Sequence, residues 1–284
     1  TYVWGILKKY RLFEKFLKEE LILSSKEYNT LKDLENENFD YDYYISGSDQ
    51  IWNVLACDFS CAYFLPFVKF GKRIAYAPSI GPHLNIEKYG NIDKIYELLN
   101  KYDAVSVREI KGSQYIENII NKQVPTVLDP TLLLDSNRYD TLIDKKPLIN
   151  GEYVFIYSPW SNENVYEMAY TLGQKYQMKV VISQGMTTKD EMLKWNRKFK
   201  IYAAVGPKEF LNLCKNASII CCDSFHAVVF SILFKKCFFV FEGMSDDRIS
   251  NLLRITHLQN RSFSLSDDYL SASLHIDYTR TSND

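Results

Sequence analysis

A histidine separates two apolar stretches in the segment CCDSFHAVVFS. The stretch before it (218–222) has the pattern of a buried strand, and the stretch after it (224–236) has the pattern of a helix. Asp223 or Ser224 would cap that helix, and His226 would lie in its first turn. An imidazole in this position can carry a proton for a reaction on a bound anion such as phosphate. The alternative is a structural histidine whose hydrogen bonds are satisfied in the core.

An arginine ends another apolar run, VSVRE at 105–109, and a helical pattern follows at 111–122. An arginine beside a helix N-terminus suits a phosphate or carboxylate ligand, because the guanidinium and the helix dipole both favour an anion. Arg108 could equally form an ion pair with Glu109 or another carboxylate. Both interpretations of Arg108 stay open at the level of sequence.

A third polar cluster occurs in SGSDQIWN, residues 46–53. Gly47 allows the backbone to turn sharply or to approach a ligand. Ser48, Asp49 and Gln50 then present three polar side chains at the end of an expected strand. The cluster is either part of a binding site or a turn followed by a helix cap.

The elements that must position these residues alternate between two patterns. Short apolar runs predict strands at 41–46, 72–79, 104–109, 125–134, 153–159, 179–185, 201–206, 218–222 and 237–242. Helical periodicity occurs at 2–20, 91–102, 111–122, 162–176, 189–199, 207–217, 224–236 and 247–258. Strands that alternate with helices of this length indicate parallel βαβ units, and therefore an α/β fold.

The alternation falls into two blocks, separated by a polar stretch without sustained periodicity at 135–151. We therefore expect an N-terminal domain at 1–140 and a C-terminal domain at 151–284, two doubly wound domains facing a cleft. Ligands of such sheets bind beyond the carboxyl ends of the strands. The polar clusters after the strands are accordingly the candidate site.

Composition excludes several classes of function. The net charge of -1 gives no reason to expect a nucleic-acid partner. The six cysteines fall mainly in apolar segments and show no zinc-site spacing, so we expect reduced thiols and no metal. No apolar run reaches the roughly 18 residues of a membrane span. The glycine-rich nucleotide fingerprints are missing.

Several motifs together resemble the polysaccharide pyruvyl transferase family. They keep their order over about residues 39–261 and are GSDQIWN (47–53), KRIAYAPSIG (72–81), VSVRE followed by Gly112, VLDPTLLL (127–134), VGPKEFL (205–211), DSFHAVVFSILF (223–234), and Arg248 with Leu252 and Leu253. The resemblance implies a fold similar to the GT-B glycosyltransferases, with two Rossmann-like domains. It also implies that 1–140 is the acceptor side and 151–284 the donor side.

The resemblance also implies a reaction. Phosphoenolpyruvate would be the donor, as a co-substrate without a further cofactor, and a sugar hydroxyl pair would be the acceptor. The product would be a cyclic pyruvate ketal on a surface or capsular polysaccharide. Since family members act in the cytoplasm on lipid-linked or polymeric glycans, we expect a cytoplasmic protein that associates peripherally with the inner membrane face through its acceptor.

Site residues carry over by their positions in the motifs. Arg108 matches the arginine of the family's SxRE motif and would hold the donor phosphate or carboxylate. His226 matches the histidine of the second-domain motif and would be the acid/base. In this scheme Asp49 orients or deprotonates an acceptor hydroxyl, with Ser48 and Gln50 as hydrogen-bonding partners.

The chain departs from the family pattern in two places. Many members carry an arginine two residues before the histidine, where this chain has Ser224. The second cationic contact to the donor would then come from Arg248, Lys208 or Arg73. Members also open with a strand and a glycine-containing loop, whereas this chain begins at Thr1 with a helical pattern. We therefore expect an N-terminal domain that lacks its first βα unit.

Two other functions remain as alternatives. The first is a nucleotide-sugar-dependent GT-B glycosyltransferase, which would need contacts for a uridine or guanosine base. The second is a non-catalytic glycan-binding relative of the transferases, favoured by Ser224 and by the missing start. Binding of nucleotides, or donor binding without turnover, would distinguish these alternatives from pyruvyl transfer.

Overall fold

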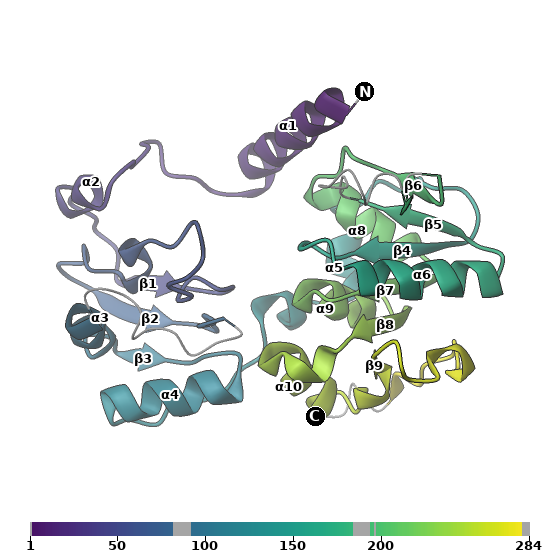
Figure 1. Cartoon of the computed structure of the whole chain (residues 1–284). Coiled ribbons are helices and arrows are strands. Elements are labelled where there is room, and N and C mark those ends of the chain that lie inside the picture. Colours follow the sequence, from purple (N-terminus) through teal and green to yellow (C-terminus); the bar gives the residue numbers. More distant parts are fainter. Residues whose placement is uncertain (1, 82–91, 184–193, 196, 280–284) are drawn as a thin grey trace. The chain divides into compact units, whose positions relative to one another are not determined.

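The computed structural model describes residues 2–81, 92–183, 194–195 and 197–279 of the chain. The chain divides into two compact units (Figure 1). The smaller unit is Ser24–Leu133, and the larger unit combines Thr1–Leu23 with Leu134–Asp284. This division differs from the expected one, because both the N-terminal helix and the stretch after residue 133 belong to the larger unit.

Specific contacts explain why the N-terminal helix belongs there. Helix α1 (Tyr2–Glu20) packs on α8 (Pro207–Asn216). Lys208 Nζ lies 2.5 Å from Glu20 Oε1. The amphipathic pattern of 2–20 predicted the helix correctly, but it could not tell which unit the helix covers.

The stretch 135–151 is anchored to the larger unit, whereas we expected a linker. It contains α5 (Ser136–Asp140), and the ring of Tyr139 packs edge-on against Phe230 with centroids 5.3 Å apart. The buried Asn212 side chain hydrogen-bonds three backbone groups of the stretch, those of Asp144, Lys146 and Leu148. The missing periodicity therefore reflects a short helix followed by an anchored loop.

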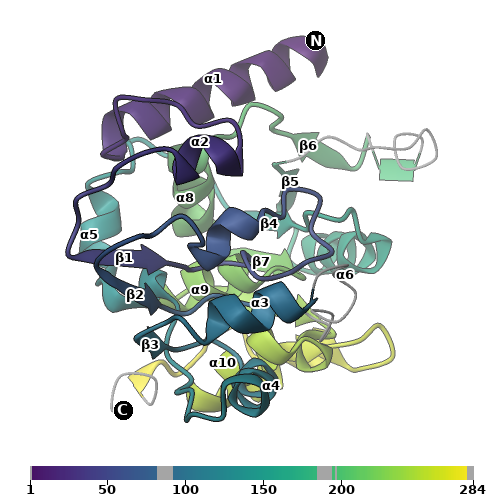
Figure 2. The same ribbon diagram turned by 90° about the vertical axis from the view of Figure 1, so that its left-hand side faces the viewer.

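The smaller unit is built on a parallel sheet of order β1-β2-β3. Its strands are β1 (Tyr43–Ser46), β2 (Lys72–Ala75) and β3 (Ala104–Val105), and its helices are α2 (Leu31–Glu35), α3 (Ile92–Leu99) and α4 (Ile110–Ile120). Helices α3 and α4 pack against each other (Figures 1 and 2). The core centres on Trp52, which is fully buried and stacks on Phe64 with ring centroids 5.2 Å apart.

The larger unit holds a parallel sheet of order β6-β5-β4-β7-β8-β9. Its strands are β4 (Tyr153–Tyr157), β5 (Lys179–Ile182), β6 (Phe199–Ile201), β7 (Ile219–Cys222), β8 (Cys237–Phe241) and β9 (Ser262–Phe263). The chain runs outward in one direction from β4 and then in the other direction from β7. The β4–β7 pair is thus the topological switch point, where such sheets bind ligands at their carboxyl ends.

Helices cover both faces of this sheet. They are α6 (Glu163–Lys175), α8, α9 (Phe225–Leu233) and α10 (Asp247–Ile255). Val154 and Ile156 of β4 share a core cluster with α6, whereas Phe155 points the other way and contacts Phe210 of α8. This alternation along β4 is what a parallel strand buried on both faces requires.

Two strand predictions were wrong and one helix falls mostly outside the described residues. Residues 125–134 form only an isolated bridge, Val107 to Thr126, and then a 3₁₀ turn at Pro130–Leu133. The strand expected at 201–206 lies earlier, as β6. Strand β9, in the polar tail, was not predicted. The helix expected at 189–199 lies largely outside the part of the chain that the structure describes.

Candidate functional site

His226 lies at the switch point of the larger sheet. Helix α9 begins directly after β7, with Ser224 as its N-cap in an extended conformation. His226 is partly exposed in the first turn, as the sequence predicts. It lines a cavity of about 450 Å³ formed by the larger unit alone. The cavity is lined by Lys9, Phe13, Tyr157, Pro159, Ser161, Ser183, Val205, Gly206, Pro207, Phe210, His226 and Phe230.

Asp223 is a polar residue of this region whose role differs from the one expected. Ser224, the N-cap residue, makes no side-chain capping hydrogen bond to α9, and Asp223 is not the N-cap residue. Asp223 instead accepts a hydrogen bond of 2.9 Å from the fully buried Ser158, which follows the neighbouring strand β4. Burial raises the pKa of the Asp223 carboxyl, and hydrogen bonds from Ser158 and Asn162 offset this only in part.

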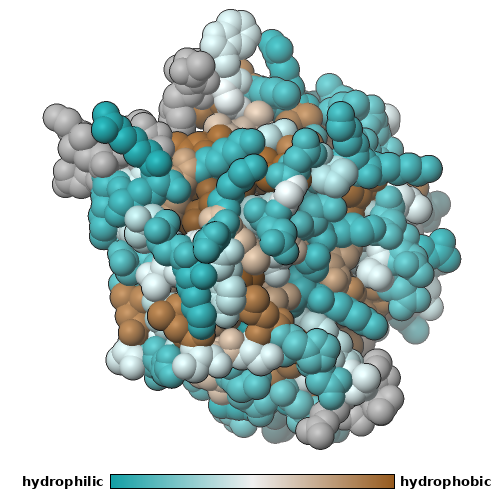
Figure 3. Space-filling view, turned by 90° about the vertical axis from the view of Figure 1, so that its right-hand side faces the viewer, coloured by the Kyte–Doolittle hydropathy of each residue, from teal (hydrophilic) through white to brown (hydrophobic). Residues whose placement is uncertain are grey.

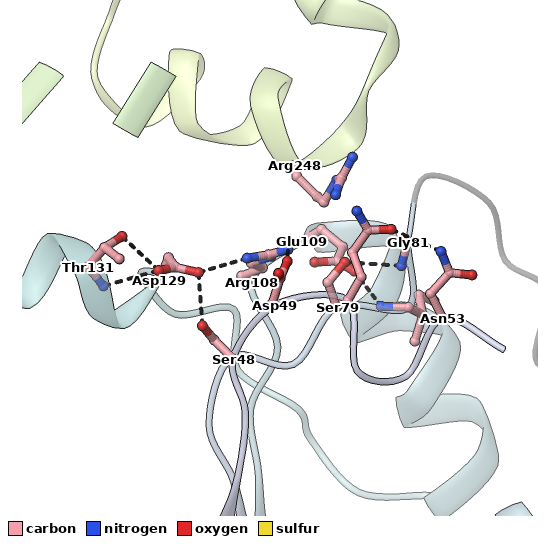
Figure 4. A network of polar contacts seen from close by, with 12 residues as sticks. Ser48, Asp49, Asn53, Ser79, Gly81, Arg108, Glu109, Asp129, Thr131 and Arg248 are labelled. Atoms are coloured by element: carbon pink, nitrogen blue, oxygen red, sulfur yellow. Dashed lines mark hydrogen bonds and ion pairs between the residues drawn. The ribbon is translucent and has the colours of Figure 1, made fainter. Parts of the chain in front are cut away.

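The smaller unit holds a polar network around Arg108 (Figure 4). The guanidinium is buried, with 1% of the side chain exposed, and bridges two carboxylates. Nη1 lies 2.7 Å from Asp129 Oδ2, and Nη2 lies 2.9 Å from Asp49 Oδ1. Ser48 donates a further hydrogen bond of 3.1 Å to the same oxygen of Asp129. The ion-pair interpretation of Arg108 is therefore the one that the geometry supports.

Glu109, the ion-pair partner that the sequence suggests for Arg108, bonds to the backbone instead. Its Oε1 accepts a hydrogen bond of 2.9 Å from the backbone of Ile80. This bond ties the start of α4 to the loop after β2, and the Glu109 side chain is buried.

The loop after β1 presents Asp49 to solvent. Its side chain is 64% exposed, although one carboxylate oxygen bonds Arg108. Gly47 has φ of +130°, and a Cβ at this position would lie 1.9 Å from the carbonyl oxygen of Tyr76. The Asp49 carbonyl accepts a 2.7 Å hydrogen bond from the Ser79 amide. The loop thus needs glycine at position 47. It is held in place at Asp49 through both the side-chain carboxylate and the backbone carbonyl.

Gln50, next in the same loop, bonds within it. Its Oε1 accepts a hydrogen bond of 2.9 Å from Asn53 Nδ2. Gln50 is partly exposed.

The three predicted auxiliary cations each have anionic or carbonyl partners. Lys208 pairs with Glu20 and, at 3.8 Å, with Glu19. Arg248 pairs with Asp246 through Nε at 3.0 Å and through Nη2.

Arg73 donates to the carbonyl oxygens of Leu65 and Val68. The guanidinium is therefore engaged with the backbone of its own unit. Among the described cations that the sequence singled out, none lies beside His226 in the cavity of the larger unit.

Two further observations concern metals and membranes. In the described ranges, no group of three or more His, Cys, Asp or Glu side chains could hold a metal ion. Within the same ranges, no helix is long and apolar enough to cross a membrane. The side of the larger unit drawn in Figure 3 carries mainly hydrophilic residues, with smaller apolar patches between them.

Comparisons with solved structures define the class of fold. A candidate UDP-N-acetylglucosamine 2-epimerase from Listeria monocytogenes superposes with a TM-score of 0.50 at 8% identity, over 89% of this chain and 65% of that one. A functionally uncharacterised protein from Klebsiella pneumoniae superposes with a TM-score of 0.50 at 15% identity, over 92% of this chain and 88% of that one. The chain spans less than two thirds of the epimerase's length. Both units are Rossmann-like, and the fold is GT-B-like.

Sequence comparison defines the family. The model of the polysaccharide pyruvyl transferase family matches residues 2–243. The chain therefore belongs to the polysaccharide pyruvyl transferase family. No curated protein matches it in sequence.

Proposed function

We propose that the protein transfers pyruvate from phosphoenolpyruvate to a pair of sugar hydroxyls, as a cyclic ketal, during the assembly of a surface polysaccharide. The observation that carries the proposal is the family match over residues 2–243, which includes the histidine in the cavity at the switch point. A lipid-linked or polymeric glycan would be the acceptor.

The reaction needs an acid, a base and groups that hold anions. One acceptor hydroxyl attacks C2 of phosphoenolpyruvate while the methylene carbon C3 takes up a proton. The C2–O bond to phosphate then breaks, and the second hydroxyl closes the ketal. The two hydroxyl protons end on C3 and on the departing phosphate, so no oxidant, reductant or metal is consumed.

His226 is the residue we assign to protonation of C3. It is partly exposed in the cavity, and the N-terminal end of α9 favours an anion nearby. General acid catalysis of this kind contributes about 100- to 10,000-fold to a rate. Ser224, the N-cap of α9, would contact the donor through its hydroxyl.

Asp49 is the residue we assign to the acceptor. Its exposed carboxylate can accept a proton from a sugar hydroxyl, and Gln50 beside it can hydrogen-bond another. Arg108 then acts as a positioning residue for Asp49 rather than as an anion clamp, because two carboxylates already neutralise its charge. Ser48 supports the same arrangement through Asp129.

The test is phosphate release from phosphoenolpyruvate with a panel of lipid-linked and nitrophenyl glycosides. We expect His226→Gln to lower the transfer rate by about 100-fold or more. His275→Gln is the matched control, because His275 is exposed in the same unit and does not line the cavity. Near-normal turnover of His226→Gln would contradict the assignment.

Ligand-dependent thermal stability separates the alternatives. Stabilisation by UDP or GDP, and none by phosphoenolpyruvate, would favour a nucleotide-sugar glycosyltransferase. Stabilisation by phosphoenolpyruvate without phosphate release on any glycoside would favour a glycan-binding relative.

A further inference from the structure

Helix α1 forms part of the wall of the cavity that holds His226. Lys9 and Phe13 line it from this helix, while His226 and Tyr157 line it from the sheet edge. The N-terminal segment is far from the DSFH motif in sequence, and α1 reaches the site by packing on the larger unit.

The position of α1 is set by close contacts with the segment 203–208. A Cβ on Gly5 would lie 2.8 Å from the Cβ of Ala203, and a Cβ on Gly206 would lie 2.6 Å from that of Leu12. Backbone and side chain therefore approach closely at both places. Lys208 adds ion pairs to the last turn of α1 through Glu19 and Glu20.

The wall of the cavity carries a single positively charged side chain, that of Lys9, among the described residues. Lys9 is the only lining residue with a permanent charge, and no carboxylate lines the cavity among the described residues. Within the described part of the chain, Lys9 takes part in no hydrogen bond or ion pair. Arg108 and Arg248, by contrast, are each neutralised by neighbouring aspartates.

The remaining wall suits a small phosphorylated anion. Ser161 and Ser183 offer hydroxyl donors, and Tyr157, Phe210 and Phe230 supply aromatic surface. Apolar surroundings strengthen the attraction between a cation and an anion, because the local dielectric constant is lower than in water. A lysine that lines the same pocket as a histidine can hold a phosphate or carboxylate group while the histidine exchanges a proton.

We propose that Lys9 of α1 holds an anionic group of the donor in the His226 cavity, and that it supplies the cationic contact that Ser224 cannot supply. The inference rests on the proposed function, since it takes phosphoenolpyruvate as the ligand. Lys9 thus takes the place of Arg248, Lys208 and Arg73 as the second cationic contact to the donor. It also gives α1 a part in the donor site.

Calorimetric titration with phosphoenolpyruvate and with inorganic phosphate tests the proposal. We expect Lys9→Met to weaken binding of phosphoenolpyruvate about 10- to 100-fold, the loss of one charge-assisted contact. Lys9→Arg should retain most of the affinity. Lys8→Met is the matched control, because Lys8 is an exposed lysine of the same helix that does not line the cavity. The affinity for inorganic phosphate should likewise fall most in Lys9→Met, less in Lys9→Arg and least in Lys8→Met.

Steady-state kinetics provides the second readout. Loss of donor binding raises the donor KM and leaves the acceptor KM unchanged. Equal affinities of Lys9→Met and Lys8→Met for phosphoenolpyruvate, with normal transfer by the wild-type protein, would overturn the role of Lys9 and leave the proposed function intact. Absence of phosphoenolpyruvate binding by the wild-type protein would overturn both. Thermal unfolding of the two variants at the same temperature excludes a folding defect as the cause.

Discussion

Two aspartates, the buried Asp129 and the partly buried Asp223, respond to their surroundings in opposite ways. Burial alone would raise the pKa of Asp129, but hydrogen bonds from Thr131 and the charge of Arg108 outweigh it and lower the pKa. Burial raises the pKa of Asp223, where the partners are the neutral Ser158 and Asn162. One carboxylate is thus stabilised by a cation, and the other accepts hydrogen bonds from neutral side chains.

This contrast predicts opposite effects of two Asp→Asn substitutions on stability. A lowered folded-state pKa contributes stability above the ordinary value near 4, which is lost as the pH falls through the folded pKa. Asp129→Asn should therefore destabilise the protein at pH 7, on the order of 3 kcal/mol for a broken buried ion pair. A raised folded-state pKa contributes stability below about pH 4, which is lost as the pH rises through the folded pKa.

Asp223→Asn should accordingly increase the free energy of unfolding at pH 7, because an amide carries no charge to bury. Its advantage over the wild-type protein should shrink as the pH approaches 4. Urea denaturation at pH 7 and pH 5 measures both effects. A loss of stability in Asp223→Asn at pH 7 as large as that in Asp129→Asn would contradict the neutral environment inferred for Asp223.

At the scale of elements, the loop that follows β1 shows how backbone geometry can place a side chain, that of Asp49, at the surface. Gly47 has positive φ and faces the Tyr76 carbonyl, so a methyl group cannot be accommodated without moving backbone. Gly151 also has a positive φ, of +81°, but nothing lies within 4 Å of a Cβ there. An alanine at either position would adopt a strained backbone conformation, but only an alanine at position 47 would also clash with neighbouring atoms.

We predict that Gly47→Ala lowers the free energy of unfolding by roughly 2–4 kcal/mol, because the clash with backbone adds to the strain. Gly151→Ala should cost only about 1 kcal/mol, the strain of a left-handed conformation. Chemical denaturation measures both. Gly47→Ala should also reduce transfer, since Asp49 lies two residues away. Equal destabilisation by the two substitutions would show that the loop relaxes around the methyl group.

At the scale of the whole molecule, the two units have separate cores. Trp52 and Leu99 belong to the core of the smaller unit, and Trp195 and Leu172 belong to that of the larger unit. All four side chains are almost fully buried. Each core therefore contains both a fluorescent reporter and a leucine that can be truncated.

We predict that truncations act on one core at a time. Leu99→Ala and Leu172→Ala should each destabilise their own unit by about 3 kcal/mol, the usual cost of a buried Leu→Ala change. Fluorescence-detected denaturation in variants that retain only Trp52 or only Trp195 measures the two units separately. Equal shifts of both reporters by either truncation would show that the units unfold together.

The sequence by itself determined the features that depend on local patterns. Apolar periodicity identified α1, β4, β7 and α9 because such patterns reflect which side of one element is buried. The place of His226 followed from the same information, since a strand–helix junction lies within a few residues. The family assignment likewise rests on short motifs in a fixed order.

Only the tertiary structure decided which distant residues meet. Asp129 and Asp49 reach Arg108 from 21 and 59 residues away, so no spacing in the sequence revealed that two carboxylates already neutralise its charge. An amphipathic helix shows that it has an apolar face but not which surface covers that face. The packing of α1 on α8, and with it the presence of Lys9 in the wall of the cavity that His226 lines, therefore became visible only in the folded chain.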